Sequence, residues 1–231
     1  EKQRLLLMDV INQAEVKKIP DSWTGQLNRL LHSAEPEVQS QVLNVIKSRR
    51  ISSFNKELDQ IAADGKASVD FRMKALSARL MSDSKLTEEQ FGLLLNFLGP
   101  KNESPVRQEA SRLLAQSKLS ESQLVTLANQ AVATADMFLL PNLVNVYRGG
   151  NDEEAGKALI KALEGGKERL DNLSVTDMQK LFETYPPTVQ SAAGSLIDIL
   201  KEKQAARLAE LEKIQSQLTR GDVGAGRQLF F

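Results

Sequence analysis

The side chains with catalytic potential in this sequence are few and widely spaced. His32 is the only histidine, and the chain contains no cysteine. A histidine acts as a general base or a metal ligand when a second ligand or an orienting carboxylate is fixed beside it. His32 lies where a helix is expected to end, a position at which a cation meets exposed carbonyl groups. We therefore interpret it as a helix-terminal residue rather than as a catalytic base.

Two acidic clusters, Glu88–Glu89 and Asp152–Glu154, bring carboxylates together, but each falls in the expected first turn of a helix. Acidic residues there interact favourably with the helix dipole. A catalytic pair needs a cleft that shifts its pKa values, and the sequence indicates none. We expect no catalytic residue, no metal site and no cofactor site here, so the sequence predicts that this chain is not an enzyme. A pocket holding His32 beside two carboxylates would favour the enzyme hypothesis instead.

Composition excludes several other classes of function. Lysine and arginine number 30, as do aspartate and glutamate, so the net charge is zero. A nucleic-acid interface usually carries a basic excess, and a polybasic membrane patch does as well. Aromatic residues make up only 5% of the chain, too few to alternate with basic residues in a surface that stacks bases. The apolar runs are far shorter than the roughly 18 residues needed to span a bilayer. We expect neither a nucleic-acid partner nor a membrane span.

The elements that hold these residues are expected to be helices. The stretch Leu86–Lys118 predicts a helix, a tight turn and a second helix. Thr87 opens the first helix with a capping-box-like sequence, and Gly99-Pro100 ends it. Ser104 is expected to cap the second helix, with Pro105 in its first turn. One apolar stripe runs along each helix: Phe91, Leu94, Leu95 and Leu98 on the first, and Val106, Ala110, Leu113 and Leu114 on the second.

This helical pair recurs along the chain. The equivalent apolar residues that anchor its second helix are Val38, Phe71, Val106 and Leu139, at spacings of 33, 35 and 33 residues. Near-constant spacing of this size is typical of helical-repeat proteins. The sequence therefore predicts an all-α, HEAT- or ARM-like solenoid wound as a right-handed superhelix. The alternative is an irregular helical bundle in which the spacing is accidental.

For two of the expected helices, the first and the one near residue 140, the sequence also predicts which residues are buried. A helix over residues 1–19 is expected to bury Leu6, Val10, Ile11 and Ala14. Another is expected to begin near Phe138, to bury Phe138 and Leu139, and to end at Gly149-Gly150.

The repeat pattern predicts three regions: helical repeats over residues 1–150, a helical cap over 151–220, and a separate segment over 221–231. Within the cap, the charged stretch Lys201–Leu218 is expected to continue the preceding helix as one long rod. It carries an apolar stripe of Leu208, Leu211, Ile214 and Leu218. The charges are interpreted as a solvated helix face, and a coiled coil with a partner is the alternative.

The segment 221–231 carries the most specific motif in the chain. Gly221, Asp222, Gly226, Leu229 and Phe230 form the pattern Gly-Asp-x-x-x-Gly-x-x-Leu-Phe, which resembles the opening helix of a class I cytochrome c domain. In that family the helix precedes the C-x-x-C-H haem-attachment motif. A dinucleotide-binding loop is excluded, because the third glycine of its G-x-G-x-x-G pattern is replaced by Leu229 and no strand precedes it.

Three further strings, Ile19–Leu31, Glu154–Leu163 and Leu181–Leu200, resemble the Planctomycetes–Verrucomicrobia-type haem-binding CxxCH proteins. That resemblance covers roughly residues 19–231 and implies a secreted or periplasmic protein with a dehydrogenase-like propeller, a HEAT-like region and a C-terminal cytochrome c. We then expect this chain, which begins with Glu1, to be a piece of a longer redox protein. Haem c would bind after Phe231, and no haem ligand is assigned to any residue here.

Two functions follow as hypotheses. The first is a non-catalytic module that spaces or docks the propeller and cytochrome c domains of the same electron-transfer protein. The second is a protein-binding solenoid that holds a separate partner on its concave face. Second helices commonly line that face, so the candidate contacts are Lys47, Arg72, Arg107 and Arg148.

Overall fold

The computed structural model describes residues 2–13 and 20–218, and these residues are predominantly helical. Within them the structure contains α-helices and short 3-10 helices and no β-strand; the sole extended pairing is an isolated parallel bridge between Lys85 and Lys118. The predicted all-α class is therefore confirmed. The residues predicted to resemble a cytochrome c helix, 221–231, and Ala14 lie outside the described residues.

The α-helices are α1 (Lys2–Gln13), α2 (Asp21–Leu31), α3 (Pro36–Arg49), α4 (Asn55–Ala63), α5 (Val69–Ser82), α6 (Glu88–Leu98), α7 (Ser104–Ala115), α8 (Glu121–Gln130), α9 (Leu140–Asn145), α10 (Glu153–Glu164), α11 (Val175–Phe182) and α12 (Pro187–Leu218). The 3-10 helices are η1 (Ser52–Phe54), η2 (Val132–Thr134) and η3 (Lys167–Asn172).

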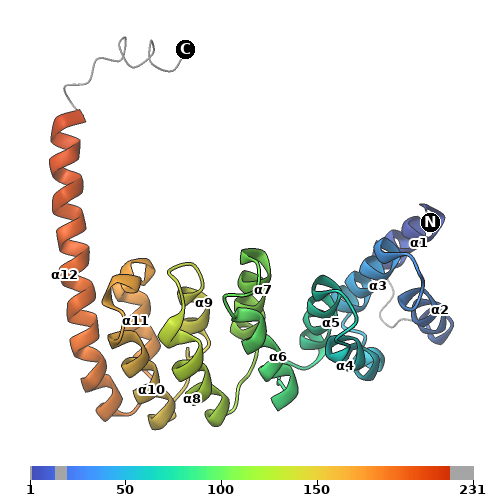
Figure 1. The fold of residues 1–231 in the computed structure, drawn as a ribbon, viewed down its shortest axis with the longest axis horizontal. Helices are drawn as coiled ribbons and strands as arrows, with labels where there is room; N and C mark the ends of the chain where they lie inside the picture. The colour runs from blue at the N-terminus through green and yellow to red at the C-terminus, as the bar shows by residue number, and fades with distance from the viewer. Residues whose placement is uncertain (1, 14–19, 219–231) are drawn as a thin grey trace.

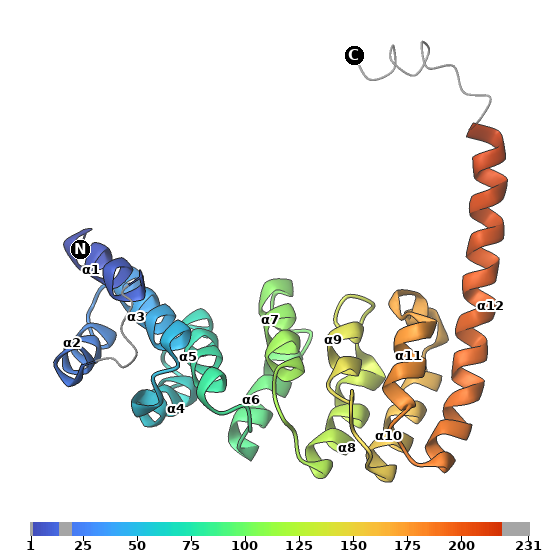
Figure 2. The ribbon, with the colours of Figure 1, turned by 180° about the vertical axis from the view of Figure 1, so that it is seen from behind.

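The helices stack in two layers that follow the order of the chain. In one layer α1, α3, α5, α7 and α9 pack each on the next, and in the other α4, α6, α8, α10 and α12 do the same. Helices of the two layers also pair, α2 with α3, α4 with α5 and α6 with α7. The row forms an open arc, with α5, α7 and α9 on its inner side (Figures 1 and 2). At the far end α12 stands upright and extends well beyond its neighbours (Figure 1).

Local sequence signals set the ends of α6 and α7. Thr87 accepts a hydrogen bond from the Gln90 N–H, and the Gln90 side chain accepts one from the Thr87 N–H, so the predicted capping box is present. Gly99 is the C-cap of α6. The prediction that Ser104 caps α7 was wrong by one residue. Glu103 occupies the N-cap position without a side-chain hydrogen bond, because the helix already begins at Ser104, with Pro105 in its first turn.

A helix in the middle of the row buries two opposite faces. Met73, Leu76 and Leu80 of α5 belong to one apolar cluster, which extends through α6 to α12. Ala75 and Ala78 of the same helix belong to a second cluster, which is formed with α1 to α4. The pair that contains α5 is therefore covered on both sides by its neighbours. The first cluster also runs without interruption past residue 150, where the sequence predicted a change from repeats to cap.

Polar contacts between neighbouring pairs repeat as well. The Gln90 side chain donates to Asp59 Oδ1 at 2.7 Å, and Gln123, the equivalent residue of the α8 capping box, donates to Glu88 Oε1 at 2.9 Å. Both glutamines are buried. Each one thus caps its own helix and holds the preceding helix of the same layer. Further side-chain contacts join positions about one repeat apart: Ser48 to Asn12, Lys74 to Ser40, Asn142 to Ser111 and Thr188 to Glu153.

Two predictions of which residues are buried, in α1 and near Phe138, need correction. In α1 the structure buries Met8 and Ile11, whereas Leu6 and Val10 are exposed, because among the helices described in its layer α1 packs mainly against α3. Phe138 is 70% exposed rather than buried. Asp136 Oδ1 accepts the backbone N–H groups of Phe138 and Leu139, and this turn delays the helix to Leu140.

The packing of α10 on α12 depends on one glycine. A Cβ atom at Gly156 would lie 2.7 Å from both Tyr185 Cδ1 and Val189 Cγ1, so the two segments approach too closely for any larger residue. The Tyr185 hydroxyl donates to the Tyr147 carbonyl at 3.0 Å, and burial raises the pKa of Tyr185 to about 12. This contact ties α12 to the turn that follows α9.

Replacing Gln123 with leucine tests the buried capping network. The change removes the N-cap hydrogen bond of α8 and leaves the Leu86 carbonyl without this donor, so we expect the free energy of unfolding to fall by about 1–3 kcal/mol. Urea denaturation measures it. The matched control is Gln108→Leu at an exposed position of α7, for which we expect a change below about 0.5 kcal/mol. Equal effects of the two changes would contradict the structural role of Gln123.

Candidate functional site

The four cationic residues predicted as concave-face contacts lie on successive units, and two of them make internal contacts. Arg72 Nε donates to the Ala62 carbonyl at 2.9 Å, and Arg107 Nε donates to the Leu98 carbonyl at 3.0 Å. Each arginine therefore binds a carbonyl in the last turn of the first helix of its own pair, where a cation also interacts favourably with the helix dipole.

These two arginines also contact the next pair. The Arg72 guanidinium lies 5.3 Å from the centre of the Phe97 ring, and Arg107 Nη2 lies 2.9 Å from Asp136 Oδ2. Both side chains are partly buried. Their positions explain why the sequence shows arginine at the same place in two units: it joins the two helices of a pair and the following pair.

Lys47 and Arg148 have different surroundings. Lys47 is half-buried near the end of α3. Arg148 is exposed, with Nε donating to Asn145 Oδ1 at 2.9 Å and Nη2 lying 3.4 Å from Asp177 Oδ1. The four residues therefore differ in burial and in their contacts.

His32 lies in an open groove of about 550 Å³ between α2–α3 and α4–α5, together with Glu57, Asp64 and Asp70. These are the residue types that the enzyme hypothesis requires. Asp70 pairs with Lys74 at 2.7 Å, Asp64 accepts the backbone N–H of Lys66, and Glu57 Oε2 is buried without a hydrogen-bond partner among the described residues. Across residues 2–13 and 20–218, no three histidine or acidic side chains are placed to hold a metal ion.

A second groove occupies a comparable place two units later. It has a volume of about 240 Å³ and is lined mainly by apolar residues near the ends of α6 and α8, among them Leu98, Ala131 and Leu139. Two of the junctions between successive pairs therefore carry a groove. The side chains that line them change from one junction to the next.

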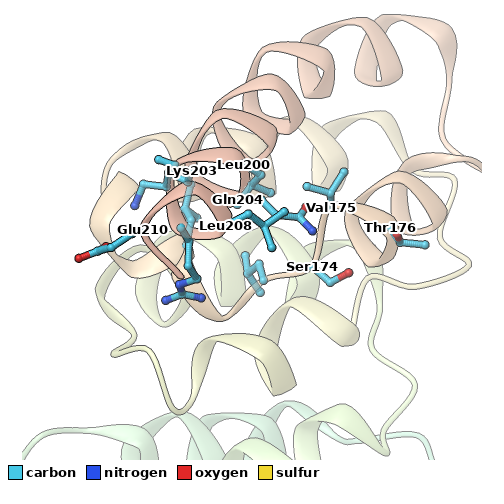
Figure 3. Close-up of a pocket in the computed structure, with 12 residues that line it drawn as sticks. Ser174, Val175, Thr176, Leu200, Lys203, Gln204, Leu208 and Glu210 are labelled. Atoms are coloured by element: carbon cyan, nitrogen blue, oxygen red, sulfur yellow. The ribbon is translucent and has the colours of Figure 1, made fainter. Parts of the chain in front are cut away.

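The largest groove described, about 660 Å³, lies between α12 and the segment that joins η3 to α11. Leu173 and Val175 line one wall, and Leu200, Gln204 and Leu208 of α12 line the other. In Figure 3 Gln204 and Leu208 point from α12 toward Ser174 and Val175, whereas Glu210 points away. The Ser174 hydroxyl accepts the Asp177 N–H and so caps α11 at the edge of this groove.

The groove opens onto an uncovered apolar stripe. The first half of α12 is packed, with Val189, Ala193, Leu196 and Leu200 buried. Beyond it, Leu208 and Leu211 are each 54% exposed and Ile214 is 44% exposed. The predicted continuous rod is therefore confirmed. Sequence reasoning missed this groove, although the apolar stripe on the charged helix was the signal that could have located it.

Comparisons with models of protein families, with curated proteins and with solved structures found no match. In the part of the chain that the structure describes, no helix combines the length and the apolar character needed to cross a membrane.

Replacing Arg72 with alanine tests whether this residue is structural. Because the change removes a hydrogen bond to a helix-terminal carbonyl and the contact with Phe97, we expect a loss of about 1–3 kcal/mol in the free energy of unfolding. Arg148→Ala is the control, and for this exposed residue we expect less than about 0.5 kcal/mol. Urea denaturation compares them. If Arg72→Ala left stability unchanged, the role assigned to its internal contacts would be refuted.

Proposed function

We propose that this chain is a HEAT- or ARM-like helical-repeat solenoid, a right-handed superhelix that acts as a non-catalytic scaffold. The observation that carries the proposal is the repetition of equivalent contacts at a spacing of one unit. Gln90 and Gln123 hold neighbouring helices of one layer in the same way, and Arg72 and Arg107 join the helices of their own pairs in the same way. Repetition of contacts between neighbours supports a stack that grows in one direction.

The surfaces of this stack suit a spacer better than an enzyme. The three grooves described above are open at the surface of the stack, and among the described residues no three histidine or acidic side chains are placed to hold a metal ion. An active site needs a nucleophile or base, an orienting group and a place for the reacting atom at hydrogen-bond distance from both. A row of helices buried on both sides instead holds two ends at a fixed separation.

On the resemblance to haem-binding CxxCH proteins, we propose that the two ends hold a dehydrogenase-like propeller and a cytochrome c domain of one secreted or periplasmic redox protein. The haem would then be bound by the segment that follows Phe231. The motif Gly221, Asp222, Gly226, Leu229 and Phe230 supports this assignment. A longer chain that includes the segment after Phe231 should show a Soret band when produced with the haem-attachment machinery, and residues 1–231 should show none.

A distance measurement tests the spacer role. The chain has no native cysteine, so spin labels can be placed at exposed positions of α2 and α12 through the double change Asn28→Cys and Glu202→Cys. We expect a single narrow distance distribution in pulsed electron resonance, because successive pairs are packed on both sides. The control, Glu202→Cys with Glu212→Cys, gives the width of the distance distribution between two labels on one helix. A much broader or multimodal distribution between α2 and α12 would refute a rigid spacer.

A further inference from the structure

The exposed half of α12 carries a stripe that is apolar except for Gln204, and we call this stripe the seam. Leu200, Gln204, Leu208, Leu211 and Ile214 follow one another at steps of four, four, three and three residues. The mean step is 3.5 residues, the period that keeps a stripe facing a partner helix in a coiled coil. Leu200 is buried within the stack, whereas Leu208, Leu211 and Ile214 are exposed. The seam therefore passes from a partnered to an uncovered part of the same helix.

The charges on this half of the helix are unevenly distributed. Residues 201–207 contain three basic side chains and one acidic side chain, for a net charge of +2, and residues 208–218 contain two acidic and one basic, for a net charge of −1. A second copy of the helix laid parallel would place like charges together. An antiparallel copy would place the basic part of each helix against the acidic part of the other, and such complementarity selects orientation.

We propose that the chain forms a homodimer through α12, with the two helices antiparallel about a twofold axis. This axis passes through the face that carries Leu208 and Leu211, at the level along the helix midway between residues 209 and 210. A twofold interface is self-complementary, so each contact occurs twice. In this arrangement Leu208 faces Leu211 of the second copy, and Arg207 faces Glu212 of the second copy. Gln204 and Gln215 of the two copies meet at the ends of the seam.

The groove beside α11 adds to this interface. Gln204 and Leu208 both line that groove and belong to the seam (Figure 3). In the proposed dimer the second copy therefore lies beside the groove at Gln204 and Leu208, opposite the wall formed by Leu173 and Val175. A pair of isolated helices of this length would be marginal in water, but each α12 is already held in place by its buried first half. Dimerisation then needs no helix nucleation.

Analytical ultracentrifugation of residues 1–231 tests the dimer. The chain has a mass of 25.6 kDa, and we expect a species of twice this mass to dominate at concentrations of about 50 µM. The double change Leu208→Glu and Leu211→Glu should shift the population to monomer, with at least a tenfold rise in the dimer dissociation constant. The control Ala209→Glu adds one negative charge, half that of the double change, to an exposed residue on the opposite side of α12 and should leave the dimer unchanged. Circular dichroism should show equal helicity in all variants, because the altered residues are exposed.

Cysteine cross-linking tests the orientation in this cysteine-free chain. Gln204→Cys and Gln215→Cys should each fail to form a disulfide alone and should form one when the two variants are mixed. A monomer at every concentration up to about 100 µM, or a dimer that survives both glutamate changes, would overturn the proposal. Efficient cross-linking of either variant with itself would overturn the antiparallel arrangement.

Discussion

The structure depends on the burial of two opposite faces of each central helix. In α5, Met73, Leu76 and Leu80 face one apolar cluster while Ala75 and Ala78 face another, so this helix is shielded only when a neighbouring pair lies on each side. Because the hydrophobic effect scales with the apolar area removed from water, such helices are unstable as isolated pairs and stable as a series. The polar contacts follow from this constraint: Gln90 and Gln123 are buried between helices of one layer and must find partners there.

The same constraint explains both ends of the described row. Leu6 and Val10 remain exposed on α1, which packs mainly against α3 among the helices described in its layer. At the other end, α12 is buried as far as Leu200 and then extends past its neighbours with Leu208 and Leu211 uncovered. Helices in the middle of the row have their apolar stripes covered by neighbours, whereas the helices at its ends leave part of theirs exposed. The homodimer proposed above would cover one of them.

Local signals in the sequence were sufficient to predict most helices. The capping box at Thr87, the stop at Gly99 and the continuous rod of α12 rest on interactions within a few residues, and all are present. Phe138 could not be placed in this way, because a turn closed by Asp136 competes with the helix and only the packed structure decides between them. Arg72 and Arg107 were correctly placed on second helices, yet their carbonyl partners lie nine or ten residues earlier and depend on how each pair folds together.

Excision of one unit tests most directly whether the chain is a series of stacked pairs. Lys85 and Lys118 are bridged side by side, and the Lys118 N–H donates to the Ser84 carbonyl at 2.8 Å, so Lys85 can be joined to Leu119 with residues 86–118 removed. Circular dichroism during urea denaturation of the shortened chain is the measurement. The account predicts cooperative unfolding with unchanged helicity per residue. The free energy of unfolding should fall less steeply with urea concentration, because the shorter chain exposes less surface when it unfolds. Loss of helicity and of cooperative unfolding would show instead that the chain depends on a single closed core.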